Sequence, residues 1–104
     1  NVKFFAADLY KTFLPIVDKY NIPKPDVMII DPPRSGMHPT TVDDVIKLSP
    51  NKIVYVSCNP TTQVRDIKIM VEAGYKLIKI RPVDMFPHTF HIENVALLQK
   101  LVQL

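Results

Sequence analysis

Cysteine and glycine are scarce in this chain of 104 residues, which contains one cysteine and two glycines. One cysteine cannot form an internal disulfide, and no other feature indicates an oxidising compartment, so we expect a cytoplasmic protein. No apolar run approaches the roughly 20 residues that a membrane-spanning helix requires. The first residues lack the basic region, hydrophobic run and small-residue cleavage site of a secretory signal. The sequence therefore gives no reason to expect a membrane partner.

A phosphate-binding loop is also absent from the sequence. Ser35-Gly36 permits a close approach of the backbone to a ligand, but neither a glycine-rich run nor a GK[ST] element accompanies it. An initiator methionine is missing as well, from which we expect a segment of a longer chain. Hydrophobic residues make up 47% of the chain, which predicts one folded domain or part of one. The net charge of +3 is compatible with a polyanionic partner without requiring one.

Apolar periodicity predicts alternating strands and helices, and hence an α/β fold. The continuous apolar run at 26–30 is typical of a strand buried on both faces of a parallel sheet. The last two strands lack an intervening helix, so we expect antiparallel neighbours at a sheet edge, joined by a loop over 85–93. The earlier strands are expected to be parallel, with right-handed crossover helices. In chain order, the expected elements are a strand Val2–Phe5, a helix from about Leu9 to Tyr20 interrupted at Pro15, a strand Asp26–Ile30, a helix capped by Thr40 or Thr41 and running to about Leu48 with Val42, Val45, Ile46 and Leu48 inward, a strand Lys52–Ser57, a helix from Thr61 or Thr62 through Val64, Ile67, Ile69 and Met70 to near Gly74, and strands Tyr75–Asp84 and Asn94–Leu104.

Three strand ends carry reactive or charged side chains. Cys58 and Asp31 each follow an apolar strand directly, and Glu93 ends a loop that also contains two histidines. The carboxyl ends of parallel strands open into the crevice where open α/β sheets bind ligands. Cys58 also precedes a predicted helix, whose positive end favours the thiolate that a nucleophile needs. A partly buried, unreactive thiol is the structural alternative.

The other residues at these strand ends allow both structural and chemical interpretations. Asp31–Pro33 is either a rigid turn or the lining of a ligand crevice, and Arg34 can pair with a carboxylate or a phosphate. Glu93 lies beside aromatic and apolar residues, a setting in which a carboxylate can serve as an acid or base. His88 and His91 can instead fix the loop by hydrogen bonds. Neither a cysteine pair nor HExxH spacing accompanies them, so we expect no metal.

Three segments resemble, in order and in spacing, the signature motifs of the S-adenosylmethionine-dependent RNA (uracil-5-)methyltransferases. They are Asp31–Gly36 (DPPRSG), Ser57–Pro60 (SCNP) and Asp84–Glu93 (DMFPHTFHIE). The resemblance implies a partial class I, Rossmann-like methyltransferase fold, in which residues 1–104 form the C-terminal portion of the catalytic domain. It also implies that this chain lacks the family's first two strands, its glycine-rich cofactor loop and its N-terminal RNA-binding domains.

The resemblance further implies a reaction and a role for each matching residue. The family methylates C5 of uridine in RNA: a cysteine adds to C6 of the base, and a base later removes the C5 proton. Cys58 matches that nucleophile and Glu93 matches that base. Asp31 matches a strand-end residue between the cofactor and the target base, and Asp8 falls where the adenine of the cofactor is often bound. The matches for substrate binding are Pro32, Arg34, Asn59 and His91, with Arg65 and Arg81 as further candidates for phosphate contacts.

The implied cofactor is S-adenosylmethionine and the implied partner is RNA, with ribosomal RNA favoured over transfer RNA. The target uridine must leave its stack or lie in a single-stranded loop, because both of its reacting carbons have to be reached. Surface charge is the structural alternative for each of the arginines. We expect this chain to be inactive alone, since it would hold only part of the cofactor site.

Other functions stay open from the sequence alone. Another methyltransferase of the Asp-Pro-Pro type would need no cysteine nucleophile, and RNA cytosine-5 methyltransferases use cysteines in other contexts. In a non-catalytic α/β module that binds RNA or a partner, Cys58 would be incidental. The missing strands would also leave an apolar edge at 26–30, which is a pairing hazard. We therefore expect either Val2–Phe5 or a second copy of the chain beside that edge.

Overall fold

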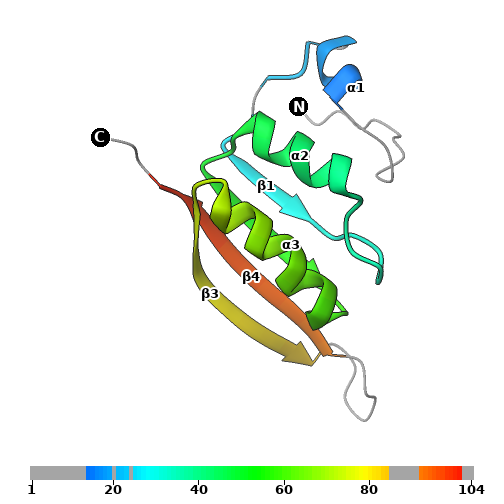
Figure 1. The fold of residues 1–104 in the computed structure, drawn as a ribbon, viewed down its shortest axis with the longest axis vertical. Coiled ribbons are helices and arrows are strands. Elements are labelled where there is room, and N and C mark those ends of the chain that lie inside the picture. Colours follow the sequence, from blue (N-terminus) through cyan, green and yellow to red (C-terminus); the bar gives the residue numbers. More distant parts are fainter. Residues whose placement is uncertain (1–13, 20, 24, 85–91, 102–104) are drawn as a thin grey trace.

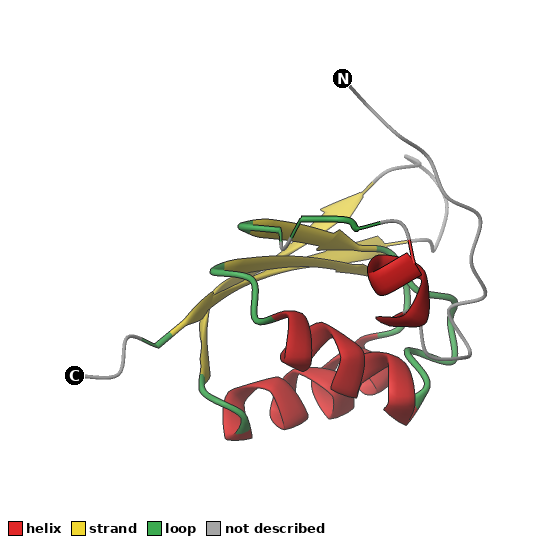
Figure 2. Cartoon of the chain, turned by 90° about the horizontal axis from the view of Figure 1, so that it is seen from above, coloured by secondary structure: helices red, strands yellow, loops and turns green. Residues whose placement is uncertain are grey.

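A computed structural model describes residues 14–19, 21–23, 25–84 and 92–101. They form one four-stranded sheet with the two longer helices side by side on one of its faces (Figures 1 and 2). No helix in this described part is long and apolar enough to cross a membrane. In chain order the elements are α1 (Leu14–Lys19), β1 (Val27–Ile30), α2 (Pro39–Leu48), β2 (Lys52–Ser57), α3 (Pro60–Glu72), β3 (Tyr75–Asp84) and β4 (Ile92–Lys100).

The sheet has the strand order β1-β2-β4-β3. β1 runs parallel to β2, with Ile30 opposite Tyr55, and β4 lies antiparallel between β2 and β3. A parallel pair needs a crossover of helical length, which α2 supplies between β1 and β2. The predicted α/β fold, with parallel strands followed by an antiparallel pair at the sheet edge, is thereby confirmed. The predicted strand Val2–Phe5 lies outside the described residues.

The core lies between the sheet and helices α2 and α3. β2 supplies Ile53 and Tyr55, which are fully buried at alternate positions, as the two-residue period of a strand requires. The facing helices and β4 supply most of the other buried apolar side chains, namely Val42, Val45, Leu48, Ile67, Met70, Ala96 and Leu98, and Ile30, Met37 and Tyr75 complete the core. The predicted inward face of α2 is confirmed, with Ile46 partly buried against the same core.

Within the part of the chain that the structure describes, β1 is covered on one face only, which corrects the prediction of a strand buried on both faces. Ile30 is buried and Met28 packs against the core, whereas Val27 and Ile29 are 53% and 73% exposed. Among the described residues β1 pairs with β2 alone, so its outer edge has no partner there. The predicted pairing with Val2–Phe5 involves residues that are not described, and pairing with a second copy stays a prediction.

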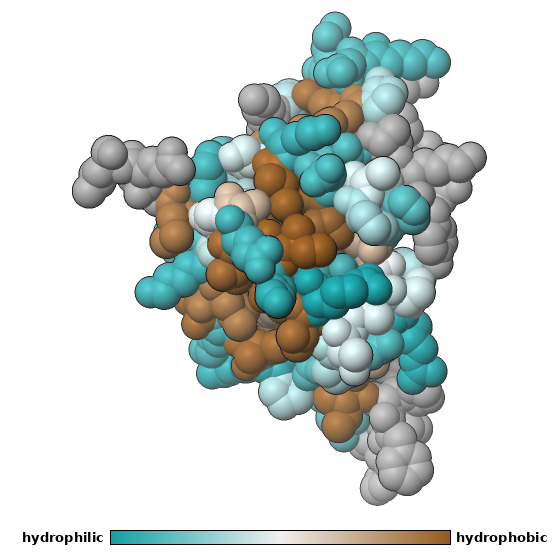
Figure 3. Space-filling model, viewed as in Figure 1, coloured by the Kyte–Doolittle hydropathy of each residue, from teal (hydrophilic) through white to brown (hydrophobic). Residues whose placement is uncertain are grey.

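Helix α3 turns two polar residues toward the core, which its apolar pattern did not indicate. The buried residues of α3 are Gln63, Asp66, Ile67 and Met70. Val64 and Ile69 are exposed instead, and apolar surface accordingly appears on the helix-covered face of the molecule (Figure 3). A buried amide and a buried carboxylate need hydrogen-bond partners, and the Nε2 of Gln63 and the carboxylate of Asp66 find them at the candidate site.

Both longer helices begin one or two residues before the threonines at which the sequence predicted them to start, Thr40 or Thr41 as the cap of one and Thr61 or Thr62 as the first residue of the other. The Nδ1 of His38 accepts the backbone N–H of Thr40 at the start of α2 (3.2 Å). The Oδ1 of Asn59 accepts the backbone N–H of Thr61 at the start of α3 (3.1 Å). The predicted cap of α2 and the predicted start of α3 are wrong because a proline occupies the first position of each helix, where its fixed φ suits the helix and its missing N–H is not needed.

Three other boundaries bear on the predictions. Pro15 lies in the first turn of α1 and does not interrupt the described helix. Gly74 follows α3 with a φ of +108°, a backbone angle that favours glycine, and this confirms the predicted helix end. β4 begins before Glu93, which pairs with Val83 of β3. Glu93 is therefore a strand residue, and the predicted loop boundary is corrected.

Candidate active site at the ends of β1, β2 and β4

Cys58 and Glu93 lie at the same end of two neighbouring strands. The last pair in the ladder between β2 and β4 joins Ser57 to Asn94. Because the two strands are antiparallel, the next residue outward is Cys58 on one strand and Glu93 on the other. Neighbouring strands run about 4.8 Å apart. The predicted nucleophile and the predicted base thus each lie one residue beyond the last pair of the same ladder.

A small hydrogen-bonded turn fixes the backbone on both sides of Cys58. The Oγ of Ser57 accepts the backbone N–H of Asn59 and donates to its carbonyl, each at 3.0 Å. Cys58 lies between these two residues, and its side chain is exposed. Asn59 caps α3, so the cysteine stands directly before the N-terminus of that helix, where the helix dipole favours negative charge.

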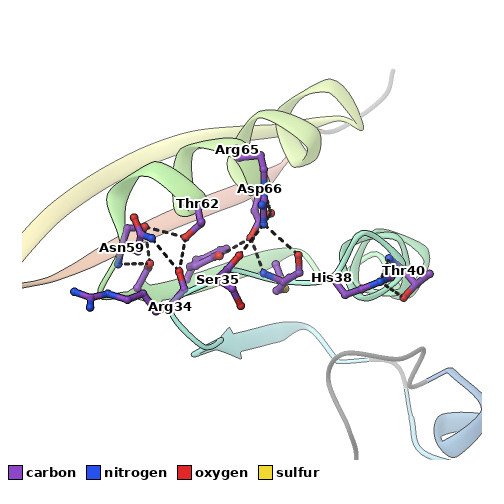
Figure 4. Close-up of polar contacts among 11 residues, drawn as sticks. Arg34, Ser35, His38, Thr40, Asn59, Thr62, Arg65 and Asp66 are labelled. Atoms are coloured by element: carbon purple, nitrogen blue, oxygen red, sulfur yellow. Dashed lines mark hydrogen bonds and ion pairs between the residues drawn. The ribbon is translucent and has the colours of Figure 1, made fainter.

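The loop after β1 is fastened to the beginning of α3. Asp31 leaves the strand exposed, Pro32 is buried, and the Gly36 N–H donates to the Pro33 carbonyl (2.9 Å). The carbonyl of Arg34 then accepts two hydrogen bonds from α3 and its cap, one from the Nδ2 of Asn59 (3.0 Å) and one from the Oγ1 of Thr62 (3.1 Å; Figure 4). The turn that holds Cys58 and the loop that begins at Asp31 therefore share contacts.

Gly36 is the point of closest approach between this loop and α3. Its φ is +80°, a backbone angle that favours glycine. A Cβ on this residue would lie 2.6 Å from the Nη2 of Arg65 and 3.0 Å from the Cβ of Thr62. Only glycine allows the loop to lie this close, which gives a physical reason for the glycine in the sequence Arg34–Gly36.

The buried carboxylate of Asp66 joins three elements at this place. Its Oδ2 accepts the hydroxyl of Tyr55 in β2 (2.6 Å) and the backbone N–H of Met37 in the loop (3.0 Å). Its Oδ1 accepts from the Nε and Nη2 of Arg65 (3.3 and 3.2 Å), and that guanidinium also donates to the carbonyls of Ser35 and Met37 (3.2 and 3.3 Å; Figure 4). Burial and the hydrogen bond to Asp66 raise the pKa of Tyr55, which stays a neutral donor.

Gln63 connects β2 to β4 close to the candidate residues. Its Nε2 donates to the carbonyls of Tyr55 (3.0 Å) and Asn94 (3.1 Å), one on each strand. Within the described part of the chain, its Oε1 and the Oε2 of Glu93 are buried without a hydrogen-bond partner.

One pocket beside β1 could hold part of a cofactor. It measures about 210 Å³ and is lined by Asp31 together with apolar residues of β1 and α2 such as Met28 and Val45. Sites for complete small-molecule ligands usually measure about 300–1,000 Å³. The chain therefore offers one carboxylate and an apolar wall to a cofactor, which fits part of a cofactor site. No cluster of three or more potential metal ligands occurs among the described residues.

The remaining predicted residues fall into three groups: residues whose side chains are bound within the fold, residues that are exposed, and residues outside the described part of the chain. Asn59 uses its side chain as a helix cap and as a donor to the loop, and Arg65 is bound to Asp66 and to loop carbonyls. The side chains of Arg34 and Arg81 are exposed. Asp8 and His91 lie outside the described residues. Sequence reasoning missed Asp66, although its position three residues after Gln63 and four before Met70 places it on the inward face of α3.

A twisted sheet with parallel strands, crossover helices and polar side chains at the strand ends is typical of α/β proteins of the Rossmann-like class. A family model described as tRNA (Uracil-5-)-methyltransferase matches residues 16–101, and the chain belongs to this family. Over 100 residues it is 44% identical to an uncharacterized RNA methyltransferase of Caldanaerobacter subterraneus, a match that covers 96% of this chain and 21% of that protein. Over 101 residues it is 48% identical to an uncharacterized RNA methyltransferase of Porphyromonas gingivalis, covering 94% of this chain and 21% of the relative.

A solved structure supports the same family and the predicted partial methyltransferase fold. The tRNA (uracil-54, C5)-methyltransferase of Pyrococcus abyssi, in complex with S-adenosyl-L-homocysteine, superposes with a TM-score of 0.61 at 49% identity. The match covers 70% of this chain and 18% of that protein. The chain thus spans about a fifth of the length of the relatives that it matches.

Proposed function

We propose that the protein containing this chain methylates C5 of a uridine in RNA, with S-adenosylmethionine as the methyl donor. The observation that carries the proposal is that Cys58 directly follows β2 and Glu93 lies in β4, each one residue beyond the last pair of the β2–β4 ladder. Family membership and the cofactor product bound to the Pyrococcus relative support the reaction class and the donor. Cys58 is the proposed nucleophile and Glu93 the proposed base.

The reaction needs both residues because C5 of uracil is a weak nucleophile. The thiolate of Cys58 adds to C6, and the electron pair of the C5–C6 double bond moves toward the O4 carbonyl to give an enolate. When bound, S-adenosylmethionine would supply its sulfonium methyl group to C5 of this enolate; the S–CH3 bond would break and S-adenosylhomocysteine would leave with the electron pair. Glu93 then takes the C5 proton, and the electrons of the C5–H bond re-form the double bond and expel the thiolate. A nucleophile and a base on adjacent strands can both reach the adjoining carbons C5 and C6.

The other predicted residues take supporting roles in this proposal. Asp31, at the end of β1, faces the cofactor or the target base, and Asp8 contacts the adenine. Pro32, Arg34, Asn59 and His91 bind the substrate around the flipped base. Asn59 does so while it caps α3, and Arg34 presents an exposed guanidinium that suits a phosphate.

The substrate class is RNA, and its kind is the open point that an assay must decide. Ribosomal RNA is our first candidate, with a role in rRNA processing in the cytoplasm. The names of the matched family and of the Pyrococcus relative support transfer RNA as the second candidate. Both RNAs should be offered to the complete protein. The chain alone should be inactive, because the pocket at Asp31 is smaller than a complete cofactor site.

Covalent trapping tests the proposed nucleophile in the complete protein. RNA that carries 5-fluorouridine has no C5 proton to remove, so the methylated adduct should persist and run as a protein–RNA complex in a denaturing gel. Cys58→Ala and Cys58→Ser should both abolish this complex. Glu72→Gln changes an exposed residue near the end of α3 and should leave it intact. A complex that persists in Cys58→Ala would remove Cys58 as the nucleophile.

The free edge of β1 supports a further part of the proposal, that isolated copies of this chain associate with each other. Val27 and Ile29 are exposed on a strand whose outer edge has no partner among the described residues. Unpaired edges of this kind readily pair with another strand. A second copy can supply that strand by placing its own β1 against it.

A further inference from the structure

The candidate site has two parts, which we call its two units. One is the β2–β4 pair with Cys58 and Glu93 at its end, and the other is β1 with the loop that begins at Asp31; only a short ladder joins them. Cys58 follows β2, which pairs with β4 over six residues. Asp31 follows β1, which pairs with β2 over four residues only, and then enters a loop with two prolines. Side-chain contacts must therefore set the position of this loop relative to Cys58.

Asp66 contacts both units directly. The N–H of Met37 donates to its Oδ2 from the loop, and the hydroxyl of Tyr55 donates to the same oxygen from β2. Arg65 adds a second link, because its guanidinium binds Asp66 and the loop carbonyls of Ser35 and Met37 together. The loop is therefore held through a backbone donor and two backbone acceptors.

A buried carboxylate at this position of α3 destabilises the fold unless its hydrogen bonds compensate for the loss of water. Asp66 is 1% exposed, and removing a carboxylate from water costs several kcal/mol before its partners compensate. An apolar residue at this point of α3 could fill the core without that penalty, but it could not accept the N–H of Met37. The hydrogen bonds of Asp66 show what the carboxylate contributes. It connects the loop, the strand before Cys58 and the helix after Cys58.

We infer that Asp66 is a positioning residue for the proposed methyl transfer, holding the loop that begins at Asp31 in register with the turn that carries Cys58. The inference rests on the proposed function. Asp66 does not reach the reacting atoms itself. Its effect passes through Met37 to the loop and through Tyr55 to β2, and misplacement of a reacting group by about 1 Å can slow a reaction about 100-fold.

The test uses the complete protein and the variant Asp66→Asn. The amide has the shape of the carboxylate, but one of its two ends can no longer accept a hydrogen bond, so some of the four donors lose their partner. We expect kcat for methyl transfer to fall between about 10-fold and about 100-fold. The rate of Cys58 alkylation by iodoacetamide should stay within about twofold, since the Ser57–Asn59 turn does not depend on Asp66.

Two further variants separate positioning from general destabilisation. Arg65→Gln changes a half-exposed side chain, and it should lower kcat in the same direction by removing the guanidinium from the loop carbonyls. Tyr75→Phe is the matched control: it deletes a buried hydrogen bond to the Pro50 carbonyl at the opposite end of the sheet and should leave kcat unchanged.

The outcomes distinguish this inference from the proposed function. An equal loss of kcat in Asp66→Asn and Tyr75→Phe, or an unchanged kcat in Asp66→Asn, would overturn the positioning role while the methyltransferase stands. A parallel loss of Cys58 alkylation would also overturn it, because the damage would then reach beyond the loop. If the unmodified protein methylates no uridine in either RNA, the proposed function itself fails.

Discussion

Glu93→Gln should stop the proposed reaction after the methyl group has been transferred. The amide has nearly the size of the carboxylate, and the buried Oε2 of Glu93 has no hydrogen-bond partner among the described residues, so the exchange removes no hydrogen bond at that atom. The fold should therefore be retained. General base catalysis contributes about 10²–10⁴-fold to a proton transfer, which raises the barrier to elimination by about 3–5 kcal/mol when the base is lost.

Two isotopes in one experiment distinguish a base from a residue that merely binds RNA. The complete protein is mixed with RNA that contains [5-³H]uridine and with a cofactor that carries a ¹⁴C methyl group. Glu93→Gln should incorporate about one methyl group per enzyme quickly, while release of tritium slows by about 10²–10⁴-fold and the covalent RNA adduct accumulates. Glu72→Gln, on the exposed part of α3, should behave as the unmodified protein does. Tritium release from Glu93→Gln at the unmodified rate, with no adduct, would refute the assignment.

Three further predictions concern the fold around the site. Gly36→Ala should destabilise the protein by about 1–3 kcal/mol, because alanine is strained at a φ of +80° and its Cβ would displace the guanidinium of Arg65; urea unfolding measures this, and an unchanged midpoint would contradict it. The raised pKa of Tyr55 keeps its phenol protonated in the fold, whereas the unfolded chain loses that proton near pH 10, so stability should be complete below pH 10 and fall above it by about 1.4 kcal/mol per pH unit for this group. Tyr55→Phe should flatten that slope in urea titrations between pH 9 and 11, and an unaltered slope would count against it. Ile29→Lys should reduce the association of the isolated chain in sedimentation velocity, because a charge on an edge strand opposes pairing; equal association of both forms would point to another surface.

The sequence predicted the elements of this fold well wherever the pattern was local. The apolar run of β2, the glycine after α3 and the missing helix between β3 and β4 each determine one feature of the fold within a few neighbouring residues. The boundary errors have local causes too. Each of the helices α2 and α3 begins earlier than predicted because a proline occupies its first position, and the caps are His38 and Asn59.

The prediction failed where burial depends on residues that are distant in the chain. Asp66 is buried because the hydroxyl of Tyr55 and the N–H of Met37 meet it, and no hydropathy pattern contains those partners. The apolar residues of β1 suggested two covered faces, yet the described part of the chain covers only the side of Ile30. Composition shows that a residue can be buried, but the neighbouring elements decide whether it is.

The same distinction explains how the candidate site is built. The positions of Cys58 and Glu93 follow mainly from backbone pairing, since each lies one residue beyond the last pair of the β2–β4 ladder. The loop after Asp31 is set by side chains, since Asn59, Thr62 and Arg65 bind its carbonyls and Asp66 binds its N–H. Substitutions in the ladder should therefore act mainly on stability. Substitutions in these side-chain contacts should act mainly on the alignment of the loop with Cys58, and hence on the rate of methyl transfer if the proposed function is correct.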